Sequence, residues 1–173
     1  MADVVKTYRQ MVPAMRFIGK KNTDEDRVEG GFGKLWGDWF ANGWFEPLEK
    51  SFDLKALYED GDAYIGLMRF KEGEPFEYWI GMFCPEGSTV PEGYGYHDFP
   101  ASDLGVVWLY GKDGEVYGQE GKCGESCMKE GFKIITDGQG AYWFFERYGC
   151  PRFTTPDEKG NIILDICHYV EKA

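Results

Sequence analysis

The chain has 173 residues, of which 43% are hydrophobic and 17% aromatic, so it is too apolar for disorder and can bury a core without disulfides or metals. The excess of 30 acidic over 19 basic residues gives a net charge of −11, which disfavours direct binding to nucleic-acid phosphates. No run of about 18 apolar residues could span a bilayer, and residues 1–6 lack the apolar core of a signal peptide. We therefore expect a cytoplasmic protein without membrane contacts.

The first half of the chain is predicted to contain a strand, a helix and two further strands. Residues 12–19 form a strand-like run that opens with a proline. From Phe32 to Leu48 apolar residues recur at helical spacing, with a weak point at Asn42-Gly43. Two more strand-like runs, joined by a turn-prone segment, follow at residues 63–70 and 76–83.

The second half repeats this plan after a loop at residues 85–93, whose two prolines and two glycines mark a crossing between halves. Its predicted elements are strands at 94–99 and 104–110, a helix from about 113 to 131, and strands at 140–148 and 161–170. We expect one domain over residues 1–173, with pseudo-repeats at about 12–86 and 94–170.

Two such units most economically form an α+β fold. Tandem duplicated strand-helix-strand-strand modules would build a curved antiparallel sheet with the helices on one face. A pseudo-twofold arrangement leaves a central cleft where the halves meet, and ligands usually bind in such clefts. No glycine-rich phosphate loop, nucleophile elbow or metal-ligating helix pair is present, so we expect neither a cofactor nor a metal.

The cysteines and histidines do not form a recognisable site. The five cysteines are odd in number and irregularly spaced, which argues against a disulfide framework. Cys123 and Cys127 could share a helix face and hold a metal or form a redox pair, but no second Cys or His pair completes a zinc site. His97 and His168 lie on separate strand-like runs and are expected at the edge of the core or on the surface.

One carboxylate, Glu146, lies within an aromatic run at residues 141–148. In a strand, Tyr142, Phe144, Glu146 and Tyr148 point one way, and Trp143, Phe145 and Arg147 point the other. A carboxylate among rings can neutralise a bound cation, and the same setting raises its pKa towards that of a general acid or base. The alternative is that Glu146 pairs with a basic residue of a neighbouring strand or lies at a solvated edge, and both interpretations stay open.

Three segments resemble the gyrase-inhibitor-like (GyrI-like) small-molecule-binding family, which is related to effector-binding domains of multidrug-responsive transcription activators. They are the run at residues 76–83 before a proline-glycine loop, Phe-Pro-Ala at 99–101, and Phe-Glu-Arg-Tyr at 145–148. The resemblance implies tandem strand-helix-strand-strand modules and makes Glu146 the match of the family's central pocket acid. We expect a standalone member, because the chain has no room for a helix-turn-helix segment before Val12.

On this basis the protein is expected to bind amphipathic aromatic or cationic small molecules, for sensing, sequestration or resistance, with Glu146 as the counter-charge. The candidate ligand-binding residues are Glu146, Trp36, Trp39, Tyr78, Trp108, Tyr110, Tyr142, Trp143, Phe144 and Tyr148. Ordinary core packing is the alternative role for each aromatic residue taken singly. The oligomeric state stays open.

Two other functions are compatible with the sequence. Because some standalone relatives open the cyclopropane ring of DNA-alkylating compounds with water, the chain could be such a hydrolase. Glu146 would be the general base and Tyr78 or Tyr110 the proton donor, with Glu77 available as a second acid. The third possibility is a protein-interaction module such as a gyrase inhibitor, which would use the acidic surface, although the acids are scattered.

Overall fold

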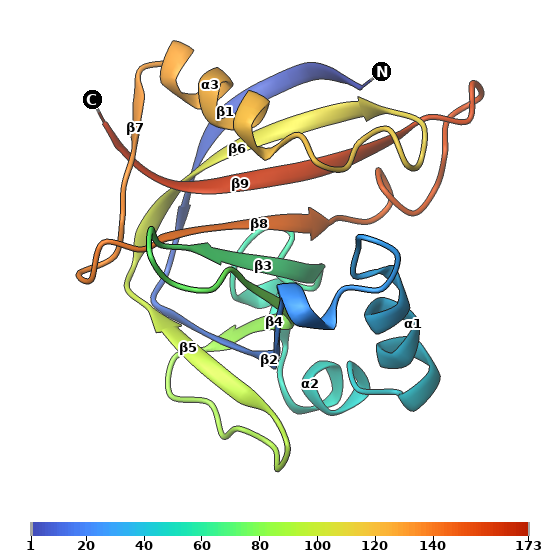
Figure 1. The fold of residues 1–173 in the computed structure, drawn as a ribbon, viewed down its shortest axis with the longest axis vertical. Helices are drawn as coiled ribbons and strands as arrows, with labels where there is room; N and C mark the ends of the chain where they lie inside the picture. The colour runs from blue at the N-terminus through green and yellow to red at the C-terminus, as the bar shows by residue number, and fades with distance from the viewer. Residues whose placement is uncertain (1, 173) are drawn as a thin grey trace.

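The computed structural model describes residues 2–172. Its main element is an antiparallel sheet of nine strands (Figure 1). In sheet order the strands are β1 (Asp3–Val12), β6 (Ser102–Gly111), β9 (Ile162–Lys172), β8 (Tyr142–Tyr148), β3 (Tyr64–Phe70), β4 (Glu77–Pro85), β2 (Met15–Thr23) and β5 (Gly95–Phe99), while β7 (Phe132–Ile134) pairs with β9. The α-helices are α1 (Gly33–Asn42), α2 (Glu46–Ser51) and α3 (Glu120–Lys129), and short 3-10 turns lie at Asp24–Asp26 and Leu54–Ala56.

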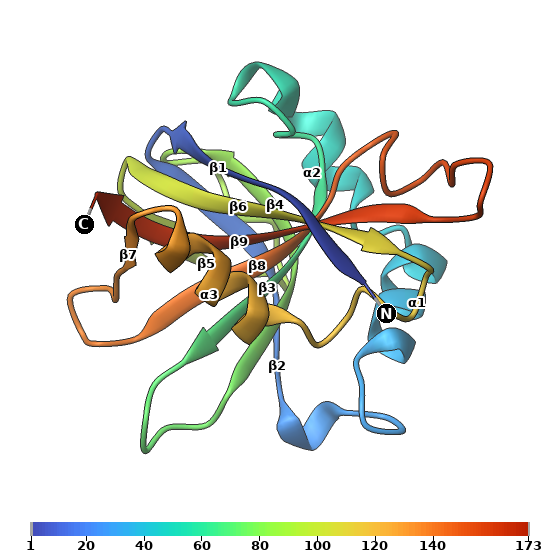
Figure 2. The same cartoon turned by 90° about the horizontal axis from the view of Figure 1, so that it is seen from above.

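The strand order is symmetrical about the boundary between β8 and β3. Outward from this boundary the order is β8, β9, β6 on one side and β3, β4, β2 on the other. In each set a helix lies between the first and second strands in sequence, namely α1 after β2 and α3 after β6. The sheet is strongly twisted, as Figure 2 shows. The predicted fold class, an α+β fold built on a curved antiparallel sheet, is confirmed.

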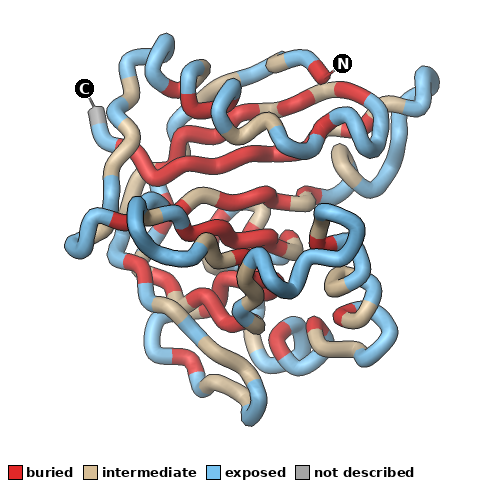
Figure 3. Tube along the Cα trace, in the orientation of Figure 1, coloured by how far each residue is buried: buried red, intermediate tan, exposed pale blue. Residues whose placement is uncertain are grey.

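Side-chain alternation along the strands separates two buried faces. One face is an aromatic and aliphatic core that includes Phe17, Leu67, Phe83 and Phe145. The opposite face is covered by the helices: Trp39 of α1 and Leu48 of α2 pack with Ile80 and Met82, and Cys123 and Cys127 of α3 pack with Val107 and Ile166. Figure 3 shows that the buried segments follow the central strands. Among residues 2–172, no helix combines the length and apolar character that a membrane crossing requires.

The strand predicted at residues 12–19 was misplaced at its start. Val12 ends β1, and β2 begins at Met15 after a two-residue connection. No strand was predicted at residues 3–11, although β1 pairs with β6 along most of its length. The reason is that β1 is an edge strand with mostly exposed or half-buried side chains, so Lys, Arg and Gln residues obscure its alternation.

Both predicted helices are shorter than expected. The helix expected to reach Leu48 ends at Asn42, because Gly43 takes a left-handed conformation (φ 66°), and a second helix follows. The helix expected from about residue 113 begins only at Glu120. Gly114 (φ 93°) and Gly118 (φ 73°) have left-handed backbones that a helix excludes, so residues 112–119 form a loop.

Candidate functional site

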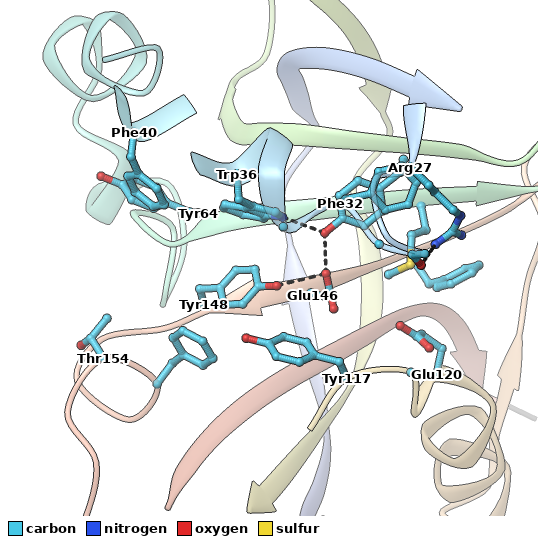
Figure 4. Close-up of a pocket in the computed structure, with 18 of the residues that line it drawn as sticks. Arg27, Phe32, Trp36, Phe40, Tyr64, Tyr117, Glu120, Glu146, Tyr148 and Thr154 are labelled. Carbon is cyan, nitrogen blue, oxygen red and sulfur yellow. Dashed lines mark hydrogen bonds between the residues drawn. The ribbon is translucent and has the colours of Figure 1, made fainter. Parts of the chain in front are cut away.

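A cavity of about 1100 Å³ lies on the helix-covered face of the sheet (Figure 4). Its floor is formed by side chains of β3, β4 and β8, including Met68, Tyr78 and Phe144. The start of α1 supplies one wall through Phe32 and Trp36, and the loop that leads into α3 supplies the other. The cavity therefore lies at the β8–β3 boundary, and both halves of the chain contribute to it.

Glu146 lies at the floor of this cavity with only 6% of its surface exposed. The hydroxyl groups of Tyr78 and Tyr148 both donate to its Oε1 atom, at 2.6 and 3.1 Å. Trp36 Nε1 in turn donates to the Tyr78 oxygen at 3.0 Å. Within residues 2–172, Glu146 Oε2 accepts no hydrogen bond and the carboxylate has no basic partner. One oxygen is thus held by phenols and the other is free towards the cavity.

The carboxylate fits only because the residue opposite it is glycine. Gly66 of β3 pairs with Glu146 of β8, so the two residues point to the same face. A Cβ atom at position 66 would lie 2.4 Å from the Tyr78 hydroxyl oxygen and 2.8 Å from Glu146 Oε1. Gly66 therefore leaves the space in which the Tyr78–Glu146 hydrogen bond forms.

Burial raises the pKa of Glu146 from 4.5 to about 7. The negative charge of Glu120 acts in the same direction, whereas the hydrogen bonds from Tyr78 and Tyr148 lower the pKa. Near neutral pH the group is therefore divided between the acid and the carboxylate. The carboxylate form has no counter-ion among the described residues, so a bound cation would stabilise it.

Aromatic rings surround the carboxylate. The Phe32 ring stacks on Tyr78 with centroids 4.2 Å apart and planes at 4°. Trp36 packs edge-on against Tyr148 at 4.9 Å, and Tyr148 packs edge-on against Phe153 at 4.6 Å. Such faces offer cation–π attraction and apolar contact to an organic cation.

The structure brings half of the predicted ligand-binding residues into the cavity. These are Glu146, Trp36, Tyr78, Phe144 and Tyr148. The alternation along β8 explains the set from that strand, since Phe144, Glu146 and Tyr148 share one face.

The other five predicted residues do not line the cavity, and each has a physical reason. Trp108 and Tyr110 alternate with Val107 and Leu109 on β6 and so face away from α3, and Trp143 likewise faces away, stacked on His97 at 4.2 Å. The side chain of Trp39, a residue of α1, is buried against Trp44 and Tyr94. Tyr142 shares the face of Glu146 but lies at the start of β8, with 42% of its surface exposed.

Several cavity residues were not predicted. Tyr64 had a detectable signal, because it lies two residues before Gly66 on the same strand face. Arg27, Tyr117, Glu120 and Phe153 lie on loops or helix starts whose positions depend on tertiary packing, and no local pattern marks them. The cavity also contains more acid than base, since Glu49, Asp62, Glu120 and Glu146 line it with Arg27.

The cysteines and histidines lie outside this constellation, apart from Cys150 at the cavity wall. Burial raises the pKa of Cys123 to about 12 and that of Cys127 to about 11, so both thiols are unreactive at neutral pH. In the described part of the chain, no three or more His, Cys, Asp or Glu side chains are grouped so as to hold a metal ion.

No protein-family model matches the sequence, and no curated protein matches it significantly. The fold is similar to that of SAV2435, solved bound to tetraphenylphosphonium, with a TM-score of 0.66 and 16% identity over 96% of this chain and 94% of that chain. It is also similar to EcmrR in an EcmrR–DNA complex, with a TM-score of 0.59 and 13% identity over 97% of this chain and 58% of that chain.

A hydrolase from Listeria innocua is a more distant match, with a TM-score of 0.52 and 14% identity over 96% of this chain and 92% of that chain. At these identities the comparisons show the fold. The chain has the α+β fold that these proteins share, in agreement with the GyrI-like resemblance of its motifs.

Proposed function

We propose that the protein binds amphipathic organic cations with aromatic groups, and that Glu146 is their counter-charge. The observation that carries this proposal is the Glu146 carboxylate, which is buried, surrounded by rings and without a basic partner among residues 2–172. Binding of this kind would serve sensing, sequestration or resistance. The similarity to a protein solved with tetraphenylphosphonium, a lipophilic aromatic cation, supports the same ligand class.

The energetics favour a cation over a neutral ligand. An ionised carboxylate at this depth is costly, as its raised pKa indicates, and a cation beside the free Oε2 atom would offset that cost. The rings would add cation–π attraction and bury the apolar part of the ligand. The volume of about 1100 Å³ is slightly above the range of about 300–1,000 Å³ that is typical of pockets for drug-sized ligands.

Tryptophan fluorescence provides the test, because Trp36 is part of the wall. Titration with tetraphenylphosphonium should quench the emission saturably, and Glu146→Gln should weaken the affinity at least about tenfold while the protein stays folded. The matched control is Glu86→Gln, which removes one charge at an exposed position outside the cavity and should leave the affinity unchanged. Unchanged affinity in Glu146→Gln would exclude Glu146 as the counter-charge.

Hydrolysis is the second candidate function, favoured by the Glu146 pKa of about 7, which suits a general base. The supporting machinery is sparse, however. The Tyr78 hydroxyl already donates to Glu146, Tyr110 faces away from the cavity, and Glu77 is engaged with Trp79 and Arg69. Glu146 Oε2 would therefore have to activate water without help from the three residues that the sequence predicted as its partners in catalysis.

Mass spectrometry separates the two candidate functions. A cyclopropane-bearing alkylating compound would be incubated with the protein, and the compound would be in large molar excess. A ring-opened water adduct that forms over many turnovers and is lost in Glu146→Gln would establish hydrolysis. Saturable quenching with the compound recovered unchanged would establish binding alone.

A further inference from the structure

We propose that Glu120 is a second counter-charge in this cavity, and that the site therefore selects ligands with two positive charges over ligands with one. The inference rests on the proposed function and adds a charge requirement to it. Glu120 lies in the cavity wall formed by the start of α3, whereas Glu146 lies on the cavity floor.

Glu120 is the first residue of α3, and its half-buried side chain lines the cavity (Figure 4). Within residues 2–172 its carboxylate has no hydrogen-bond donor and no ion-pair partner. Glu146 Oε2 also lacks a partner among these residues and faces the same cavity. Only 6% of the surface of Glu146 is exposed, so the residue is 94% buried. Two carboxylates that have no basic partner among residues 2–172 thus face one apolar space.

The neighbouring basic residues are committed elsewhere. Lys122, two residues further along α3, donates to the backbone oxygen of Ala2 at 2.9 Å. Arg27, the basic residue of the cavity lining, pairs with Asp24 at 2.7 Å and also donates to the backbone oxygen of Gly30. Neither side chain neutralises Glu120.

The other lining acids differ from Glu120 in having partners. Glu49 accepts a hydrogen bond from the Tyr64 hydroxyl at 2.5 Å, and Asp62 pairs with Lys55 at 3.7 Å. Both are exposed at the rim, where water screens their charges. Glu120 is the lining acid whose setting most resembles that of Glu146.

The fold holds Glu120 in place. His168 Nε2 lies 3.2 Å from the backbone oxygen of Glu120, within hydrogen-bonding distance. The His168 ring in turn stacks on Phe144 at 5.4 Å, and Phe144 is part of the cavity floor. The start of α3 is therefore linked to the same strand that carries Glu146, which keeps the two carboxylates on fixed elements.

The charge balance explains the expected selectivity. A ligand with one positive charge would neutralise one carboxylate and leave the other facing a space from which the ligand has displaced water. A dication would neutralise both, and charge interactions strengthen where water is excluded. The negative charge of Glu120 also contributes to the raised pKa of Glu146, as expected if the two carboxylates interact electrostatically across the cavity.

Isothermal titration with matched ligands tests the inference. The monocation is a biphenyl bearing one trimethylammoniomethyl group. The dications carry one such group at each end of either a phenylene or a biphenylene spacer, so that two charge separations are sampled. We expect the better dication to bind about tenfold more tightly than the monocation. Glu120→Gln should remove this preference, and Glu146→Gln should weaken the binding of both the monocation and the dications.

Glu125→Gln is the control, because it removes the same charge from an exposed position of the same helix outside the cavity lining. The preference should survive in this variant, which separates a local effect from attraction by the net charge of −11. Equal affinity for monocation and dications, or a preference that persists in Glu120→Gln, would overturn the inference while leaving cation binding intact. If no cation binds the wild-type protein, the proposed function fails as well.

Discussion

At the scale of single residues, the site depends on one carboxylate and one glycine. Glu146 is buried because Phe144 and Tyr148 flank it on the same strand face, and it keeps a free oxygen because both phenols donate to Oε1. Gly66 provides the space for this arrangement. The sequence indicated the carboxylate through its aromatic neighbours, but the role of Gly66 depends on the register between β3 and β8.

Replacing Glu146 with Gln should stabilise the protein in a pH-dependent way. The pKa of Glu146 is about 7 in the folded protein and 4.5 in its ordinary state, so between these values the folded state holds a proton that the unfolded state has lost. Stability therefore falls as the pH rises from 4.5 to 7, and the loss is complete above 7. Gln removes this loss, so the variant should gain about 3 kcal/mol at pH 8.

Urea denaturation of both proteins at pH 5 and pH 8 measures this effect. The gain should shrink to less than about 1 kcal/mol at pH 5, where most of the penalty is absent. Comparing the two proteins at each pH cancels the contributions of other titrating groups. A gain of equal size at both pH values would show that the pKa of Glu146 is not raised.

Gly66→Ala should disrupt the site through steric conflict. The added methyl group would displace the Tyr78 hydroxyl or the Glu146 carboxylate, at a cost of about 1–3 kcal/mol in unfolding free energy and with loss of cation affinity. Gly121→Ala is the control, because a Cβ atom there meets nothing within 4 Å and alanine favours the helix. Gly121→Ala should be neutral or stabilising. An unaffected Gly66→Ala variant would contradict the assigned geometry.

At the scale of elements, β8 serves both faces of the sheet. Glu146 faces the cavity, while Arg147 faces the opposite core and binds Asp165 of β9 at 2.8 Å. Arg152 also pairs with Asp165 and binds Asp60 at 3.0 Å, which secures the loop that carries Phe153 and Thr154 to the cavity. The sequence predicted that Glu146 and Arg147 point to opposite faces, but not that a buried ion network holds the loop.

Asp165→Asn should destabilise the protein by about 3–5 kcal/mol, because Arg147 is fully buried and would lose its principal counter-charge. The control Asp103→Asn breaks a partly exposed pair with Arg9 (3.7 Å) and should cost less than about 1 kcal/mol. Chemical denaturation of both variants provides the measurement. Similar losses of unfolding free energy for the two substitutions would show that burial of the Arg147 ion network does not increase its contribution to stability.

The prediction of elements succeeded where the pattern is strong and failed at their limits. The runs at residues 63–70 and 76–83 correspond to β3 and β4, which are almost wholly buried and therefore rich in strand-forming types. The helix limits were wrong because glycines with left-handed backbones end or delay both helices. A glycine in the sequence does not reveal which sign of φ it will take.

At the scale of the whole molecule, the central pairing of β8 with β3 joins the two halves into one sheet, and the cavity draws walls from both. We propose that residues 2–172 act as one ligand-binding domain. Unfolding in a calorimeter should then show one transition. A cation present at 100 times its dissociation constant should raise the melting temperature by about 5–10 °C, since such binding stabilises the folded state by about 2.7 kcal/mol.

The same experiment has a clear opposite outcome. Two transitions, with only one of them moved by the ligand, would show that the halves unfold independently and that the cavity belongs to one of them. Glu146→Gln should remove most of the ligand-induced shift, and Glu86→Gln should retain it.

The amino-acid pattern was sufficient to predict an antiparallel α+β architecture and to place Glu146 with Phe144 and Tyr148, because strand alternation and amphipathic spacing are local properties of the chain. The tertiary structure determines which side chains from distant parts of the sequence contact that carboxylate. Tyr78 reaches Glu146 through the pairing of β3 with both β4 and β8, and Trp36 and Glu120 reach the cavity through helix packing. These contacts join residues far apart in sequence, and strand register and helix docking are consequences of the complete core rather than of any local segment.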